Sequence, residues 1–188
     1  MRRLLLPALM ISLMLSGCGG TNAAMRRVEE QRELFAGAEE MTFTADITAD
    51  AGDELFSCTL HCTAEPDLTH VELLAPESLI GVRAEIKDGE ATLEYGEISL
   101  GIGPAGLDSV TPVSAVPLMV SALRDGFLQR CWTEQDGGRK LIAAEEYAEE
   151  KTALTIWYDS ETMQTVHCEF SQDGKTVLRC EVRDFTMR

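Results

Sequence analysis

The sequence is poor in aromatic and basic residues. Aromatic side chains make up 6% of the 188 residues, and 16 lysines and arginines stand against 32 aspartates and glutamates, which gives a net charge of −16. Because nucleic-acid binding depends on lysine and arginine gathered on one face, this balance argues against a nucleic acid as partner. The 45% of hydrophobic residues can still bury a core, which argues against overall disorder. The length fits one domain of ordinary size.

Motifs for catalysis and cofactors are equally scarce. No Gly-x-Ser-x-Gly elbow occurs. The three histidines stand in predicted strands, and nothing places a nucleophile or carboxylate beside His61 or His167. We expect His61 and His167 on solvent faces. The string Gly101-x-Gly103-x-x-Gly106 matches a dinucleotide fingerprint, but Pro104 interrupts it and the required parallel βαβ unit is missing. These absences predict a protein that is not an enzyme and has no cofactor.

Long hydrophobic runs are confined to the N-terminus. Arg2 and Arg3 precede an apolar run over residues 4–15, and the segment Leu15-Ser16-Gly17-Cys18 closes it. The run is too short for a mature transmembrane helix, which needs about 20 apolar residues, and it is typical of a cleaved signal peptide over residues 1–17. The last four residues resemble the lipobox of bacterial lipoproteins, which makes Cys18 the lipid anchor. An ordinary signal peptide with an accidental cysteine is the alternative.

A lipidated Cys18 would carry a diacylglyceryl group, and two acyl chains are what stable anchoring requires. Cleavage removes two arginines and no acid, so the mature chain would carry a net charge of −18. Anionic lipid headgroups repel such a surface. We therefore expect an exported protein that its acyl chains alone hold at the outer face of the bacterial cell membrane, with residues 18–25 as the lipidated cysteine and a tether.

Most of the remaining sequence alternates between apolar and polar residues, the pattern of strands with one buried and one wet face. The turns Asp88-Gly89, Asp136-Gly137-Gly138 and Asp173-Gly174 separate several of these runs. Such short links favour antiparallel neighbours, because a parallel crossover needs about a dozen residues or more. The predicted strands are 41–48, 56–63, 69–75, 82–87, 91–95, 97–100, 129–134, 140–145, 152–158, 165–171 and 176–185.

Two segments depart from this period. Residues 26–40 place Val28, Leu34, Phe35 and Ala38 among acidic residues, which predicts an amphipathic helix. Residues 101–117 are rich in glycine and proline and predict a loop, followed by a short helix over residues 118–128. The glutamates Glu145, Glu146, Glu149 and Glu150 indicate a solvated run.

These patterns predict an α+β fold over residues 26–188, in a single domain. Its main part is a mainly antiparallel, strongly curved β-sheet that forms an incomplete β-barrel. The N-terminal helix and the helical insertion are expected to act as a lid over its concave face.

Five cysteines follow Cys18, and an odd number in an exported chain cannot all pair internally. They are Cys58, Cys62, Cys131, Cys168 and Cys180. Cys58 and Cys62 alternate with Leu60 and are expected to point inward, but their Cα atoms would lie about 13 Å apart on a strand, which does not suit a zinc site. We expect no metal here.

The last two predicted strands each carry an apolar face with a cysteine at its centre. Val166, Cys168 and Phe170 form one face, and the other is centred on Cys180. Both can be buried on the same side only if the connection at Asp173-Gly174 has an odd effective length, as with a bulge, which would make Cys168 and Cys180 diagonal neighbours. A disulfide between them and five reduced, buried thiols are both compatible with this spacing, and we favour the reduced state.

The order of these elements, together with the closing block from Leu154-Thr155-Ile156-Trp157-Tyr158-Asp159 to Val182-Arg183-Asp184-Phe185, resembles the LolA/LolB family of lipoprotein carriers. It also resembles the related lipoproteins of spore-forming bacteria, including the GerS group of clostridial germination lipoproteins. The resemblance implies an incomplete β-barrel whose helical lid covers an apolar cavity for acyl chains. This chain differs from the soluble carrier in its lipobox cysteine, and it lacks the basic lid that some members carry.

Ten apolar residues on inward positions of successive strands either form an ordinary core or line such a cavity. They are Phe43, Ile47, Phe56, Leu60, Val71, Leu73, Ile86, Leu93, Trp157 and Phe170. On this basis we expect a membrane-anchored, non-catalytic module that binds a lipid, an acylated partner or an envelope protein. The alternative, which the resemblance to the GerS group implies, is a protein-interaction factor that regulates a cell-wall hydrolase of the spore cortex.

Overall fold

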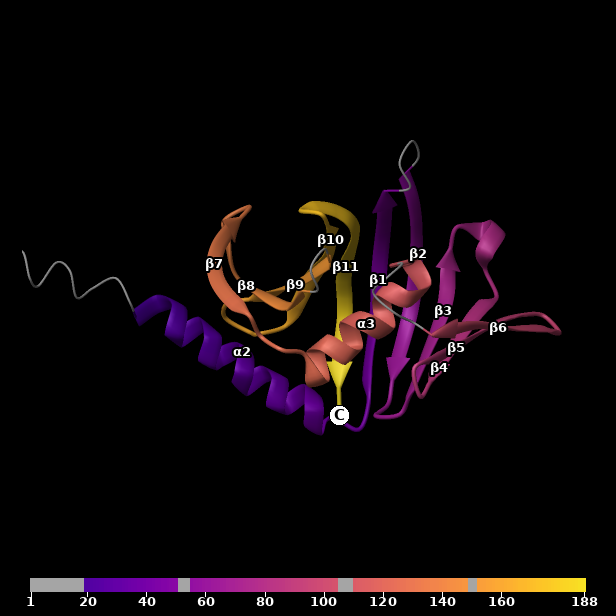
Figure 1. Cartoon of the computed structure of the whole chain (residues 1–188), viewed down its shortest axis with the longest axis horizontal. Helices are drawn as coiled ribbons and strands as arrows, with labels where there is room; N and C mark the ends of the chain where they lie inside the picture. Colours follow the sequence, from indigo (N-terminus) through magenta and orange to yellow (C-terminus); the bar gives the residue numbers. More distant parts are fainter. Residues whose placement is uncertain (1–18, 51–54, 105–109, 149–151) are drawn as a thin grey trace, which may run out of the picture.

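Eleven strands form one antiparallel sheet in the computed structural model, which describes residues 19–50, 55–104, 110–148 and 152–188. Figure 1 shows that the sheet curves strongly without closing. The strands are β1 (Met41–Asp50), β2 (Leu55–Ala64), β3 (Leu68–Ala75), β4 (Val82–Lys87), β5 (Glu90–Tyr95), β6 (Ile98–Pro104), β7 (Arg130–Asp136), β8 (Arg139–Ala148), β9 (Thr152–Asp159), β10 (Thr165–Gln172) and β11 (Lys175–Met187). This architecture confirms the predicted α+β fold with an incomplete antiparallel barrel.

The strand order places the first and the last strand at the centre of the sheet. The order is β6-β5-β4-β3-β2-β1-β11-β10-β9-β8-β7, so β1 pairs with β11, and β6 and β7 stand at the two edges. Each half is a meander of hairpins. Asp88-Gly89 and Asp173-Gly174 have positive φ at both residues, the conformation of a type I′ turn, which links β4 to β5 and β10 to β11.

Two helices cover the concave face (Figure 1): α2 (Gly19–Gly37) precedes β1, and α3 (Pro112–Asp125) connects β6 to β7. A short 3-10 helix, η1 (Glu77–Leu79), follows β3. The side chain of Thr111 accepts a hydrogen bond from the Ser114 backbone N–H, and Pro112 occupies the first helical position of α3. This capping box satisfies a backbone donor that the first helical turn otherwise leaves unpaired.

The predicted helix boundaries are partly wrong. α2 begins at Gly19 and not at Arg26, because Ala23, Ala24 and Met25 favour a helix and Ala24 is buried in the core. The segment expected to be an irregular tether therefore forms the first turns of this helix. Leu34, expected on the apolar stripe, is exposed on its outer side.

The insertion also differs from its prediction. α3 begins six residues before the predicted helix, because Thr111 and Pro112 start it, and residues 101–104 extend β6 where a loop was expected. Gly126 ends the helix.

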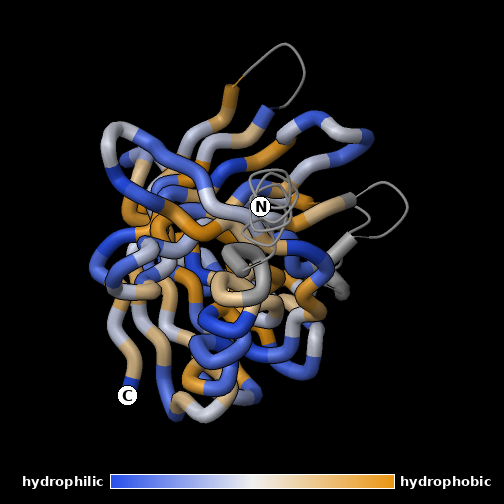
Figure 2. The backbone as a smooth tube through the Cα atoms, turned by 90° about the vertical axis from the view of Figure 1, so that its left-hand side faces the viewer, coloured by the Kyte–Doolittle hydropathy of each residue, from blue (hydrophilic) through white to orange (hydrophobic). Residues whose placement is uncertain are grey.

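The core fills the space between the concave face and the helices. It joins side chains of α3, including Ala115, Val116, Met119 and Leu123, to Val28 and Phe35 of α2 and to the inward residues of the strands. Burial of one large apolar side chain of this kind stabilises the fold by about 1.5–3 kcal/mol. Figure 2 shows hydrophobic and hydrophilic stretches distributed along the whole described chain.

Candidate ligand-binding site

The structure brings together most of the ten side chains predicted to line a cavity. Phe43, Ile47, Leu60, Val71, Ile86 and Phe170 belong to the main core cluster, Leu93 packs against it, and Leu73 is buried. Phe43 and Phe170 are 0% exposed. A side chain without surface accessible to water cannot line an open cavity, so Phe43 and Phe170 belong to a filled core. A ligand would have to bind beside this core. Their role in holding a lipid stays a prediction.

Two of the ten residues do not occupy the expected buried, inward position. Phe56 is 37% exposed, because it lies near the outer end of β2 beyond the helices. Trp157 points to the opposite face of the sheet: its neighbours Ile156 and Tyr158 belong to the main core, whereas Trp157 belongs to a second cluster with Leu141 and Ala143. Both faces of β9 carry apolar residues, so the alternation does not identify its inward face.

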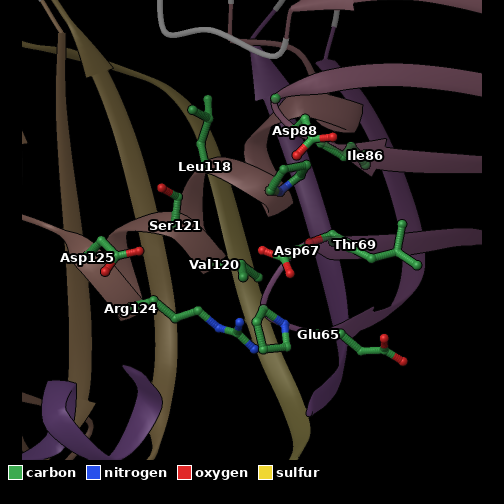
Figure 3. Close-up of a pocket in the computed structure, with 14 residues that line it drawn as sticks. Glu65, Asp67, Thr69, Ile86, Asp88, Leu118, Val120, Ser121, Arg124 and Asp125 are labelled. Carbon is green, nitrogen blue, oxygen red and sulfur yellow. The ribbon is translucent and has the colours of Figure 1, made fainter. Parts of the chain in front are cut away.

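A cavity of about 300 Å³ opens beside α3 (Figure 3). The β2–β3 turn, the start of β3, the end of β4, the β4–β5 turn and one side of α3 surround it. Its walls carry the apolar side chains of Ile86, Leu118 and Val120, of which Ile86 is one of the predicted cavity residues. The volume is at the lower end of the range for ligand pockets, about 300–1,000 Å³.

Arg124 is the basic residue of this cavity, and sequence reasoning missed it. The side chain extends from the last turn of α3 toward Glu65 and Asp67 (Figure 3). It is 8% exposed, and its Nη2 donates hydrogen bonds to the carbonyl oxygens of Ala64 at 3.0 Å and of Ala38 at 3.5 Å. Burial lowers the pKa of Arg124, while Asp125 and Asp67 act in the opposite direction. An arginine in the last turn of an otherwise apolar helix was the signal that could have identified it.

Four carboxylates surround the opening of the same cavity. Glu65, Asp67, Asp88 and Asp125 all line it and are exposed. The cavity thus combines a buried floor of Arg124, Thr69, Ile86 and Val120 with an acidic rim. This arrangement can hold an apolar group and can hydrogen-bond both acceptors and donors, but it offers no nucleophile with an adjacent base.

A second buried polar group lies under α2. Arg32 of α2 forms an ion pair with Glu146 of β8, and the Tyr158 hydroxyl donates a hydrogen bond to Glu146 Oε1 at 3.4 Å. Glu146 is 0% exposed, so the prediction that it belongs to a solvated run is wrong. The strand β8 continues past Glu145, and Glu146 follows Ile142 and Ala144 on the inward face. Burial raises the pKa of Glu146 to about 7, against the opposing effects of Arg32 and Tyr158.

The outer face of β7–β10 carries an aromatic cluster. Trp157 stacks on His167 with ring centroids 4.4 Å apart, and the carboxylate of Glu134 accepts hydrogen bonds from the indole N–H groups of Trp132 and Trp157. His167 is buried, contrary to the expectation of a solvent-facing residue, because Trp157 covers it. Burial lowers its pKa. A bulge between Thr165 and His167 also places Val166 in this cluster and not on the face of Cys168 and Phe170.

All five cysteines after Cys18 are buried and free in the described chain. Cys58 and Cys62 point inward, as predicted. Burial raises the pKa of Cys58 and Cys131 to about 11 and that of Cys62 to about 12. The described residues contain no group of three or more His, Cys, Asp or Glu side chains that could hold a metal ion.

The predicted anchor Cys18 and the signal peptide lie outside the described residues. Within the part of the chain that is described, none of the helices has the length and hydropathy needed to cross a membrane.

No family model matches the chain, and no curated protein is significantly similar to it in sequence. Among solved structures, an uncharacterized conserved protein from Thermus thermophilus is 14% identical with a TM-score of 0.52, and the match covers 88% of each chain. A domain described as an outer membrane lipoprotein-sorting protein from Vibrio parahaemolyticus is 9% identical with a TM-score of 0.50, over 88% of this chain and 93% of that one. A LolA superfamily protein from Nitrosomonas europaea is 13% identical with a TM-score of 0.49, over 90% and 94%. Similarity at these identities concerns the fold alone, and the first two matches agree with the incomplete antiparallel barrel that the sequence predicts.

Proposed function

We propose that this chain is an exported, membrane-anchored lipoprotein that binds the acyl part of a lipid or of an acylated envelope partner without catalysis. The observation that carries this proposal is the 300 Å³ cavity between the helix α3 and the concave side of a LolA-like sheet. Its walls of Ile86, Leu118 and Val120 offer an apolar surface to a segment of an acyl chain.

The anchor follows from the sequence. The lipobox-like segment ending at Cys18 supports a diacylglyceryl anchor, and α2 begins directly after it at Gly19. The binding module would then stand one helix away from the membrane surface, where lipids and acylated proteins are the nearest ligands. Two acyl chains on Cys18 are sufficient for stable attachment.

Native mass spectrometry of the full chain, extracted in a non-ionic detergent and titrated with short-chain phospholipids, tests the acyl-binding proposal. The variant Ser121→Trp places a large ring in the cavity from an exposed position of α3. It should weaken lipid binding by about tenfold or more, a loss of about 1.4 kcal/mol. The control Ser57→Trp adds the same ring at an exposed position of β2 and should bind as the parent chain does. Absence of lipid binding to the parent chain would contradict the proposal.

The second candidate function is the binding of a protein partner, as expected of a factor that regulates a cell-wall hydrolase. The observation in its favour is an exposed apolar group at the β5–β6 edge, where Tyr95 and Ile98 are paired residues with exposed fractions of 54% and 69%. Exposed apolar groups of this kind occur at protein interfaces. Pull-down with the full chain as bait should capture an envelope protein that the variant Ile98→Glu releases, while Ser99→Glu on the same strand, also exposed, should keep it. Equal capture by both variants would contradict this second candidate.

A further inference from the structure

The charged side chains of the cavity beside α3 lie at two depths, the basic one buried and the acidic ones exposed. Arg124 lies at the floor of the cavity, where 92% of its surface is buried and 8% is exposed. The four carboxylates of Glu65, Asp67, Asp88 and Asp125 stand at the exposed rim. The floor therefore offers one positive charge within apolar walls, and the rim offers negative charge to solvent.

The guanidinium of Arg124 has unused hydrogen-bonding capacity. Its Nη2 is held by the carbonyl oxygens of Ala64 and Ala38, whereas Nε is buried with no acceptor among the described residues. A buried donor without a partner destabilises the fold. The accessible part of the Arg124 side chain lines the cavity and brings a positive charge to it, so the floor favours a ligand with an anionic oxygen.

Ligands of one charge sign fit this cavity poorly. A purely anionic ligand would have to pass four carboxylates to reach one guanidinium, and a purely cationic ligand would place its charge against Arg124. A zwitterion avoids both penalties when its anionic group points inward and its cationic group stays at the rim. The apolar walls add a place for a hydrocarbon segment next to the anionic group.

We propose that this cavity recognises the headgroup of an amine-bearing zwitterionic phospholipid, with a phosphate oxygen at Arg124 and the ammonium group among the rim carboxylates. The inference rests on the proposed acyl-binding function and names the class of lipid that the same site selects. A free small zwitterion with an anionic oxygen next to an ammonium group shares this chemistry.

The test compares three probes on the full chain in non-ionic detergent, with dissociation constants measured by native mass spectrometry. They are dihexanoyl phosphatidylethanolamine, dihexanoyl phosphatidylglycerol and phosphoethanolamine without acyl chains. We expect the ethanolamine lipid to bind about tenfold or more tightly than the glycerol lipid, a preference of the size that one charged contact gives. Phosphoethanolamine alone should bind more weakly than the ethanolamine lipid.

Variants at the rim test the recognition without disturbing the core, since Arg124 also holds the backbone at Ala38 and Ala64. The double variant Asp67→Asn/Asp125→Asn should remove the preference between the two lipids. The control Asp136→Asn changes an exposed acid at the end of β7, away from the cavity, and should keep the preference.

The outcomes separate the two proposals. Equal binding of both lipids, unchanged by the rim variant, overturns the headgroup inference and leaves acyl binding intact. Phosphoethanolamine that binds as tightly as the ethanolamine lipid overturns acyl binding and supports a site for small zwitterions. Failure of all three probes to bind overturns both.

Discussion

Cys168 and Cys180 face each other directly across the β10–β11 pair in the centre of the core. A register shift between Phe170 and Ser171 brings their two apolar faces to the same side, so the predicted bulge is present, but the cysteines are opposite and not diagonal. They belong to one row of buried side chains that crosses the sheet. The row is Cys58, Ile47, Cys180, Cys168, Ile156, Ala144 and Cys131.

The five buried thiols, four of them in this row and the fifth at Cys62, should be unreactive in the folded protein. Burial raises the pKa of Cys168 well above its ordinary value, and a hydrogen bond with Cys180 adds to this shift. Because the thiolate is the reactive form, we expect iodoacetamide at pH 8 to label the five buried cysteines about a hundredfold more slowly in the native protein than after unfolding. Peptide mapping by mass spectrometry reads each site separately.

The same experiment reports the redox state. After unfolding without reductant, all five cysteines should take the label. Fewer than three labelled sites among these five, or a Cys168–Cys180 peptide lighter by two hydrogens, would contradict the reduced state that we expect.

The stability of the fold should depend on Glu146 near neutral pH. In the folded chain the pKa of Glu146 is raised to about 7, whereas an ordinary glutamate has a pKa near 4.5. This group's contribution is therefore complete below about pH 4.5 and is lost as the pH rises through 7. We expect the free energy of unfolding to fall by up to about 3 kcal/mol across that interval on account of Glu146.

Urea unfolding at pH 5, 6, 7 and 8 measures this effect. Glu146→Gln should reduce the decrease in stability between pH 5 and 8 relative to the parent chain, because glutamine does not titrate. Glu145→Gln, at the neighbouring position that pairs with Arg130, should keep it. Identical pH profiles for the parent and Glu146→Gln would show that Arg32 keeps the carboxylate charged throughout.

Two phenylalanines on the concave side should differ sharply in their importance. Phe170 is 0% exposed and contacts the main core, so Phe170→Ala should lower the free energy of unfolding by about 3–5 kcal/mol. Phe56 is at the exposed end of β2, and Phe56→Ala should cost about 1 kcal/mol or less. Chemical denaturation of both variants compares them. Similar losses would mean that Phe56 is buried in solution.

Two glycines next to the helices form a matched pair. A Cβ at Gly126 would lie 2.3 Å from the Ala122 carbonyl oxygen at the end of α3, whereas a Cβ at Gly37 meets nothing within 4 Å. We expect Gly126→Ala to destabilise the fold by about 1–3 kcal/mol and Gly37→Ala to be neutral or slightly stabilising. Thermal unfolding of the two variants checks this order, and a harmless Gly126→Ala would contradict the close approach.

The sheet was largely predictable from the sequence. Alternation identified each strand to within a few residues, and the Asp-Gly turns gave their antiparallel order. Glu146 was missed because the strand runs beyond its predicted end at residue 145. Periodicity could not show the bulge before His167 that moves Val166, nor the exact offset that sets Cys168 opposite Cys180. A single extra residue reverses every later side chain on a strand, and nothing in the composition marks where it occurs.

The candidate site was less predictable. The core residues were found because they alternate, but alternation does not separate a filled core from a cavity wall. Arg124 and the rim carboxylates come from a helix and two turns that meet only in the folded chain. Trp157 shows the remaining difficulty: when both faces of a strand are apolar, the sequence cannot tell inside from outside.

The pairing of β1 with β11 sets an order for assembly of the sheet. Each half of the sheet forms from local hairpins, but the seam between them joins Met41 to Met187, and the backbone N–H groups of Glu39 and Glu40 bond to the carbonyl oxygen of Arg188. Contacts this distant in sequence form slowly, because closing so long a loop costs entropy first. The last strand in the sequence, β11, is therefore the one that joins the two halves, and a chain without β11 would keep two hairpin stacks with no pairing between them.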